Sequence, residues 1–216
     1  MIEKIFVIGF GKNATTTFHE MFLQNGLKSQ HEQLYWDTKK YDCFSDGGEK
    51  RDLKKLYKEY PNAIYILNTR SLEQWLLSRL KHNYAKHKTT PSVSCVIRYI
   101  ELRKEYYKKT LNFFKNKPNK LIIISIDEPH WINFICNLLK FKNTDIESQN
   151  VRKTVKIIDQ INEIVKLSFK KLNFTSKQKH TILLENNENF LDLYTNNIKI
   201  KPKQKKRKGS IKIFYK

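Results

Sequence analysis

The sequence predicts an α/β fold of three layers, with a central parallel sheet flanked by helices. Three continuous apolar runs of strand length, at residues 4–9, 63–67 and 121–126, predict buried strands. Each run is followed by a segment whose apolar residues recur at three- and four-residue spacing, which is typical of helices. Because strands that alternate with helices form parallel sheets, this order predicts the layered architecture.

Helical periodicity and capping residues predict the remaining elements. The polar stretch that ends at Gly48 has no clear periodicity and is interpreted as irregular. Ser71 is expected to cap one helix, and Asp127 with Pro129 marks the start of another. We expect one helix that ends near Gly26 and further helices at about residues 50–60, after Ser71, at 93–114, up to Leu139 and from about 155 to 172. A short strand is expected at 27–30.

The chain divides by composition into three parts. Residues 1–153 are expected to form the α/β core, residues 154–198 a helical C-terminal extension of the same domain, and residues 199–216 a basic tail. The tail holds nine of the 42 basic residues and no acid. The other abundant residues, Asn, Ile, Tyr and Phe, are those that an AT-rich coding sequence produces.

A formal net charge of +21 favours phosphate-rich ligands. Only seven of the basic residues are Arg, however, so coding composition explains much of the charge, and nucleic acid is a partner that the sequence allows without favouring it. No apolar stretch is long enough to span a membrane, and no signal peptide is seen at the start. Three widely spaced cysteines, Cys43, Cys95 and Cys136, fit reduced thiols and predict a cytoplasmic protein without a zinc site.

The segment at residues 9–17, between the first strand and the first helix, is the clearest candidate for a binding site. It contains Gly9, Gly11, Lys12 and three consecutive threonines that end at Thr17. Backbone N–H groups at a helix N-terminus favour an anion, so we expect a phosphate there. Alignment with the ATP-binding motif G-x-x-x-x-G-K-[ST] places Thr15 where the phosphate-bridging Lys belongs, which is evidence against an ordinary NTPase.

The same segment resembles the phosphosulfate loop K-[ST]-G-T-[TS] of sulfotransferases that use 3′-phosphoadenosine 5′-phosphosulfate (PAPS). Lys12-Asn13-Ala14-Thr15-Thr16 matches this pattern with two substitutions, Asn for Ser/Thr and Ala for Gly. The family binds the 3′-phosphate of the cofactor through an Arg at the end of a later strand and a Ser eight residues further on. Arg70 and Ser78 stand at that spacing.

Two further likenesses extend the match over about residues 4–153. The segment Ile126-Asp127-Glu128-Pro129-His130-Trp131 is similar to a late strand and helix of one soluble group in the family, where an Asn-x-Arg-Lys segment like that at 150–153 follows. We interpret Trp131 as a core residue. The Arg207-Lys208-Gly209 tripeptide also matches a 3′-phosphate motif, but chance explains it better within so basic a run.

The resemblance implies a P-loop NTPase-like fold and transfer of a sulfuryl group from PAPS to an acceptor hydroxyl or amine, carried by a small molecule or a glycan, without a metal. Lys12 would assist the leaving group, and Gly11, Asn13, Ala14, Thr15, Thr16 and Thr17 would surround the 5′-phosphate. Asp46, Glu32 and His31, in that order, are the candidates for the general base. The alternatives are a P-loop kinase of small molecules or nucleotides, and an inactive relative that binds nucleic acid through its tail.

Overall fold

The computed structural model describes residues 3–32, 34–117, 120–142, 146 and 157–180. Its centre is a sheet with strand order β2-β3-β1-β4-β5, in which every neighbouring pair is parallel. The α/β fold with a central parallel sheet is therefore confirmed, and the strand order is consistent with a P-loop-like fold. The strands are β1 (Ile5–Val7), β2 (Ser29–His31), β3 (Cys43–Ser45), β4 (Ile64–Thr69) and β5 (Leu121–Ser125).

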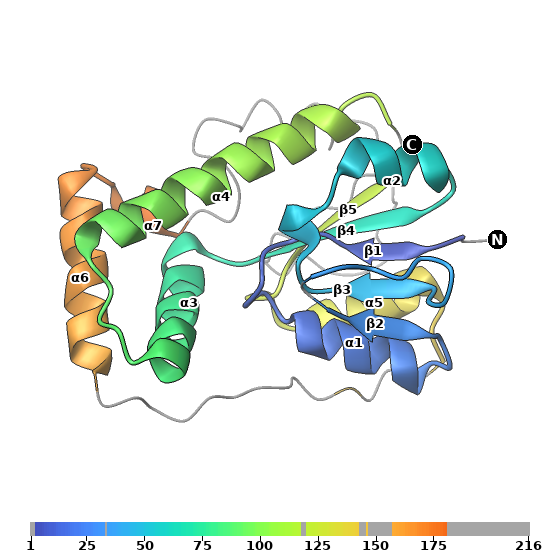
Figure 1. Cartoon of the computed structure of the whole chain (residues 1–216), viewed down its shortest axis with the longest axis horizontal. Coiled ribbons are helices and arrows are strands. Elements are labelled where there is room, and N and C mark those ends of the chain that lie inside the picture. Colours follow the sequence, from blue (N-terminus) through green and yellow to red (C-terminus); the bar gives the residue numbers. More distant parts are fainter. Residues whose placement is uncertain (1–2, 33, 118–119, 143–145, 147–156, 181–216) are drawn as a thin grey trace, which may run out of the picture.

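Helices cover both faces of this sheet (Figure 1). On one face lie α1 (Thr15–Gln24) and α5 (Trp131–Leu139), and on the other lie α2 (Leu53–Glu59) and the long α4 (Val93–Phe114). Side chains of a strand alternate between faces, so Ile5 and Val7 pack with α1 and α5, whereas Phe6 packs with α4. Trp131 is buried in the first of these clusters, as expected of a core residue.

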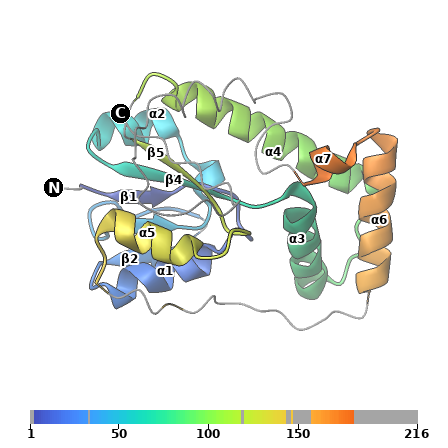
Figure 2. The same ribbon diagram turned by 180° about the vertical axis from the view of Figure 1, so that it is seen from behind.

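A group of helices extends beyond the sheet (Figure 2). It contains α3 (Leu72–His87), α6 (Ile158–Lys171) and the single turn α7 (Ser176–Lys179), with the first half of α4. The buried residues Ile161, Val165 and Phe169 of α6 join the same core cluster as strand residues Phe6 and Tyr65. Helix α6 thus packs against α3 and α4, and its apolar residues belong to the same core cluster as those of the sheet.

The interpretation of residues 31–48 as irregular was wrong, because this stretch contains strand β3. Cys43, Phe44 and Ser45 are all buried between β2 and β1. Three residues are too few to show a period of two, so the pattern could not reveal the strand. The short strand expected at 27–30 is displaced to Ser29–His31, and a 3₁₀ turn, η1 (Gly48–Lys50), precedes α2, which begins at Leu53 behind an Asp52 cap.

One predicted helix cap was wrong, and the other is correct in position but not in its hydrogen bond. The Asp127 and Pro129 signals do not start α5, which begins at Trp131 behind His130 in a left-handed conformation (φ 70°). Ser71 occupies the N-cap position of α3, but its side chain makes no capping hydrogen bond. Its backbone N–H instead donates to Oδ2 of Asp127 at 2.6 Å. The aspartate therefore caps α3 across the sheet edge rather than its own helix.

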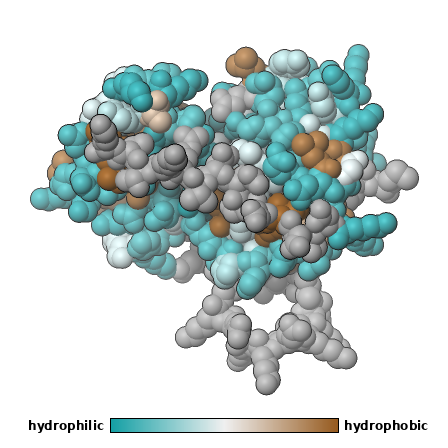
Figure 3. Space-filling model, turned by 90° about the horizontal axis from the view of Figure 1, so that it is seen from below, coloured by the Kyte–Doolittle hydropathy of each residue, from teal (hydrophilic) through white to brown (hydrophobic). Residues whose placement is uncertain are grey.

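None of the helices in the described ranges is long and apolar enough to cross a membrane. The face of the molecule shown in Figure 3 is mainly hydrophilic, with smaller hydrophobic areas between hydrophilic residues. Within the same ranges, the three cysteines are free thiols. The Asn-x-Arg-Lys segment at 150–153, the tripeptide at 207–209 and the basic tail lie outside the described residues, and the proposed domain limits stay predictions.

Candidate phosphate-binding site

The strand order creates a topological switch point at the carboxyl ends of β1 and β3. The chain leaves β1 for α1 on one face of the sheet, and it leaves β3 for α2 on the opposite face (Figure 1). Where neighbouring strands send their connections to opposite faces, the loops separate, and such switch points are where α/β proteins bind ligands. Two loops lie at this switch point, residues 8–14 after β1 and residues 46–47 after β3.

Hydrogen bonds from β4 and α3 hold the loop after β1 in place. The backbone N–H of Gly9 donates to Oδ1 of Asn68 at 2.8 Å, and Nδ2 of Asn13 donates to the Asn68 carbonyl at 3.2 Å. Nε1 of Trp75 donates to the Gly11 carbonyl at 3.1 Å. Asn13 is fully buried, so its side chain serves this scaffold.

The backbone of the loop has the geometry of an anion-binding nest. Lys12 (φ 75°) and Ala14 (φ 60°) adopt positive φ, whereas Asn13 between them does not. Alternation of right- and left-handed residues turns successive N–H groups toward one concave surface. Helix α1 begins directly afterwards, and no side chain of the described residues caps its N-terminus. The first N–H groups of α1 and its dipole thus complement the nest, as an anion site requires.

This geometry predicts that Ala14→Gly stabilises the protein. A left-handed L-residue costs about 1–2 kcal/mol, and the flexibility of Gly in the unfolded chain returns about half of that. We expect the free energy of unfolding to rise by about 0.5–1 kcal/mol in urea titrations. Ala85→Gly, the same substitution within α3, is the control and is expected to lower the unfolding free energy by about 1 kcal/mol. Equal losses in both variants would contradict the assigned conformation.

The structure brings two of the three general-base candidates to the nest. Nε2 of His31, at the end of β2, lies 3.3 Å from Oγ1 of Thr15, the first residue of α1. The same nitrogen lies 3.9 Å from Oδ2 of Asp46, which follows β3. Asp46 is 7% exposed, and its Oδ1 packs so closely on Gly11 that a Cβ there would lie 3.1 Å away. Imidazole, carboxylate and hydroxyl thus lie together beside the loop after β1.

Glu32, the remaining candidate, does not join this group. Its Oε1 accepts the backbone N–H of Leu34 at 2.9 Å, and its carbonyl accepts Nε1 of Trp36 at 3.2 Å. Both contacts lie within the connection between β2 and β3. Glu32 therefore organises its own loop, and the catalytic role that we considered for it stays a prediction.

His19 was not singled out from the sequence, yet it lies beside His31. Their ring centroids are 5.6 Å apart, and Nδ1 of His19 shares a 2.9 Å hydrogen bond with Oγ of Ser29. Burial, and secondarily the neighbouring His31, lowers the pKa of His19 below its usual value. Both effects disfavour the protonated imidazole of His19. No sequence signal marks this residue, because the contact depends on how α1 lies against β2.

Arg70 stands directly after β4, as expected, but it has an acidic neighbour. Its Nε donates to Oδ1 of Asp127 at 3.2 Å, across the ends of β4 and β5. The sequence pattern had assigned Asp127 to a helix cap, so this ion pair was missed. The pair fixes the direction of the Arg70 guanidinium and lowers the positive charge that it presents.

A second arginine, Arg103 on α4, compensates for that loss of charge. Its side chain is 2% exposed, and its Nη2 donates to Oγ1 of Thr69 at 3.2 Å and to the Arg70 carbonyl at 2.5 Å. The guanidinium lies 5.0 Å from the ring centroids of both Trp75 and Tyr107. Burial lowers the pKa of Arg103, but an arginine stays charged at neutral pH. Two guanidinium groups and one carboxylate leave a net positive charge at this end of β4.

The structure does not bring Ser78 to this cluster. It lies two turns into α3, which leads away from the sheet (Figure 1). Among the described residues, no hydrogen bond joins Ser78 to Arg70 or to the loop after β1. The expected role for Ser78 at a 3′-phosphate stays a prediction.

No protein-family model matches the chain, and no curated protein matches it. The functional interpretation therefore rests on the local geometry.

Proposed function

We propose that this protein is a sulfotransferase that moves a sulfuryl group from PAPS to a hydroxyl or amine. The proposal requires two anion sites at a fixed separation, because the donor carries a 5′-phosphosulfate and a 3′-phosphate on one nucleoside. It also requires a proton acceptor beside the first site.

The observation that carries the proposal is that the nest and Arg70 follow two neighbouring strands, β1 and β4. In the parallel pair β1 and β4, Val7 is opposite Ile66. The nest begins five residues after Val7, at Lys12, and Arg70 comes four residues after Ile66. Adjacent strands lie about 4.8 Å apart, so both sites leave the same sheet edge side by side. A nucleotide that carries phosphate groups at both its 5′ and 3′ positions suits this pair of sites.

The residues around the nest fit the chemical demands of sulfuryl transfer. The acceptor oxygen forms a bond to sulfur while the bond from sulfur to the 5′-phosphate oxygen breaks, and the acceptor loses a proton. In our proposal, His31 takes this proton and Asp46 stabilises the imidazolium that results. Lys12, Thr15 and Thr16, with the backbone N–H groups of the nest, hold the phosphate that leaves.

Calorimetry with 3′-phosphoadenosine 5′-phosphate (PAP), the desulfated product, tests this proposal. We expect the full chain to bind PAP without a metal, with a Kd in the micromolar range. Lys12→Ala should weaken binding about tenfold or more, because it removes a charged hydrogen bond to the phosphate. Lys28→Ala removes an equal charge from an exposed position and should leave the affinity unchanged.

The same titration with ATP and Mg²⁺ separates this proposal from the kinase alternative. A kinase needs the metal ion, and Asp46 beside the nest would be the residue to hold it. Binding of ATP that requires Mg²⁺, with no binding of PAP, would reject the sulfotransferase in favour of the kinase.

A further inference from the structure

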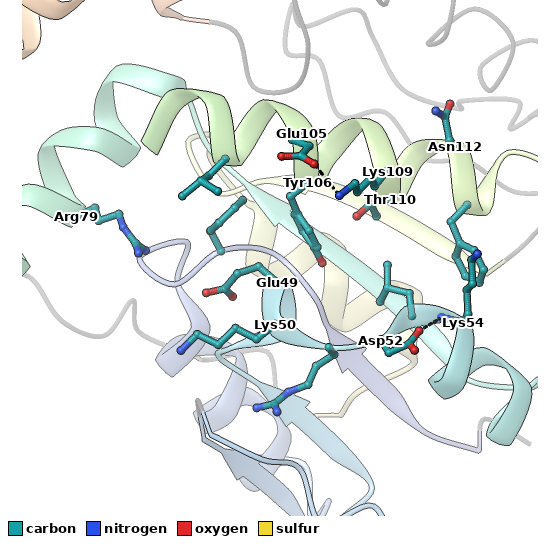
Figure 4. A pocket seen from close by; sticks show the side chains of 15 residues that line it. Glu49, Lys50, Asp52, Lys54, Arg79, Glu105, Tyr106, Lys109, Thr110 and Asn112 are labelled. Carbon is teal, nitrogen blue, oxygen red and sulfur yellow. Dashed lines mark hydrogen bonds and ion pairs between the residues drawn. The ribbon is translucent and has the colours of Figure 1, made fainter. Parts of the chain in front are cut away.

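A cavity of about 880 Å³ lies between α4 and the segment that follows β3 (Figure 4). One wall is α4, and the opposite wall is η1 with the start of α2. The hydroxyl of Tyr106 on α4 donates to the Ile8 carbonyl at 2.6 Å and lies 3.4 Å from the Gly48 carbonyl of η1. Because this side chain joins α4 to the opposite wall, the fold itself fixes the separation of the two walls.

The wall formed by α4 is a stripe of side chains along one side of the helix. Leu102, Tyr106, Lys109 and Phe113 follow at spacings of four, three and four residues, and all of them line the cavity. Nζ of Lys109 lies 2.7 Å from Oε1 of Glu105, so the charge on this wall is neutralised within α4. Leu102 is 45% exposed although it is a large apolar side chain. Apolar surface of α4 is thus open to the cavity.

The opposite wall carries more positive than negative charge. The basic residues that line the cavity are Lys50, Arg51, Lys54, Arg79 and Lys109, and the acidic residues are Glu49, Asp52 and Glu105. Within the described part of the chain, the ammonium groups of Lys50 and Lys54 form no ion pair and no hydrogen bond. The carboxylate of Asp52 accepts the backbone N–H groups of Lys54 and Lys55 at the start of α2. This wall therefore favours an anion and disfavours a cation.

The dimensions of the cavity suit a small, elongated molecule. Leu102 and Phe113 are eleven residues apart on α4, so the stripe is about 16 Å long at 1.5 Å per residue. A partner helix of that length and about 10 Å in diameter would occupy roughly 1,250 Å³. That volume exceeds the cavity of about 880 Å³, whereas small-molecule sites commonly have volumes of this size.

We propose that this cavity binds an elongated apolar molecule with one anionic group, of the class of a fatty acid. The hydrocarbon chain lies along α4, where its burial against Leu102 and Phe113 contributes most of the affinity. The carboxylate lies against the opposite wall, where Lys50 and Lys54 supply hydrogen-bond donors and positive charge. An amine of the same length contacts the same apolar stripe but is repelled by these cations.

This inference goes beyond the proposed sulfotransferase function. A fatty acid anion has neither the two phosphate groups of the donor nor a hydroxyl or amine that could accept a sulfuryl group. Phe10 connects the two sites, since it lines the cavity and also belongs to the loop after β1. Because binding to the cavity requires no nucleotide, the experiment below tests it separately from the binding of PAP.

Calorimetry with dodecanoate, dodecylamine and octanoate tests the ligand class on the full chain without nucleotide. We expect dodecanoate to bind about tenfold or more tightly than dodecylamine, which has the same chain length but carries an ammonium group. Dodecanoate should also bind about 30-fold or more tightly than octanoate, because four further methylene groups are buried along α4. Equal affinities for the two twelve-carbon compounds, a preference for the amine, or no gain from the longer chain would overturn the proposal.

Matched leucine variants test the position of the hydrocarbon chain. Leu102 and Leu167 are both 45% exposed and lie within helices, but only Leu102 lines the cavity. We expect Leu102→Asp to weaken dodecanoate binding about tenfold and Leu167→Asp to leave it unchanged. Equal effects of the two substitutions would place the ligand outside this cavity and reject the proposal.

Matched lysine variants test the position of the carboxylate. The double variant Lys50→Glu with Lys54→Glu should remove the preference for dodecanoate over dodecylamine, because it reverses the charge of the wall. Lys55→Glu with Lys58→Glu changes two exposed lysines of α2 that do not line the cavity, and it should keep the preference. A preference for dodecanoate that survives in the first double variant would contradict the assigned position.

Discussion

Replacement of Gly9 by Ala is expected to lower the free energy of unfolding by about 3–5 kcal/mol. A Cβ at this position would lie 2.0 Å from the Asn68 carbonyl oxygen and 2.3 Å from its Oδ1. Relief of this overlap requires β1 and β4 to separate at the start of the loop. The variant would lose the buried hydrogen bond from the Gly9 N–H to Asn68 in addition to the overpacking cost. Urea denaturation followed by fluorescence measures the loss.

Gly26→Ala is the control for this prediction. Gly26 follows α1 with φ 77°, but a Cβ at this position would have nothing within 4 Å, so only backbone strain opposes the substitution. We expect a loss of about 1 kcal/mol. If both variants lose the same amount, the close approach of Gly9 to Asn68 is not what fixes the loop.

The second large effect is expected for Trp75→Ala, with a loss of about 3–5 kcal/mol. Trp75 is 1% exposed and contacts Phe10 of the loop, with ring centroids 5.2 Å apart. Its Nε1 also donates to the Gly11 carbonyl. One side chain thus connects the core under α3 with the anion-binding nest, so its removal affects both stability and binding.

Milder variants separate these two consequences. Trp75→Phe keeps an aromatic side chain but loses the hydrogen bond to Gly11, so PAP affinity should fall about fivefold in calorimetry. Trp131→Phe changes a buried tryptophan in the other core cluster and should leave PAP affinity unchanged while it lowers stability by a similar amount. A fall in affinity for Trp131→Phe as large as that for Trp75→Phe would mean that affinity follows stability alone.

The fold was predictable where apolar residues form long continuous runs. The runs around β1, β4 and β5 gave the parallel sheet, and the periodicity of α4 gave its bounds at Val93 and Phe114. β3 has only three residues and was missed, although its position between β2 and β1 brings Asp46 to the loop. A local sequence pattern reveals a helix or strand only when the segment is long enough to show a period. A strand of three residues is instead defined by its pairing with the neighbouring strands.

The candidate site was predictable only for the residues that directly follow a strand. The Gly-rich loop and Arg70 follow strands, so the ends of parallel strands place them on one edge of the sheet. The positive φ of Ala14 and the contact of His31 with Thr15 depend on tertiary packing. Arg103 lies 33 residues from Arg70 on an amphipathic helix, where nothing in the pattern distinguishes it from a solvent-facing basic residue.

The central claim is that Arg70 and the nest together bind a nucleotide with two phosphates, and one comparison tests it most directly. It measures the affinities of PAP and of adenosine 5′-phosphate, which lacks the 3′-phosphate, for the wild-type chain, Arg70→Ala and the exposed control Arg98→Ala. We expect the wild type and Arg98→Ala to prefer PAP by about 30-fold, the equivalent of about 2 kcal/mol for a charged hydrogen-bonded contact. Arg70→Ala should bind the two nucleotides almost equally. A wild-type chain that does not distinguish them, or an Arg70→Ala variant that keeps the full preference, would contradict the account.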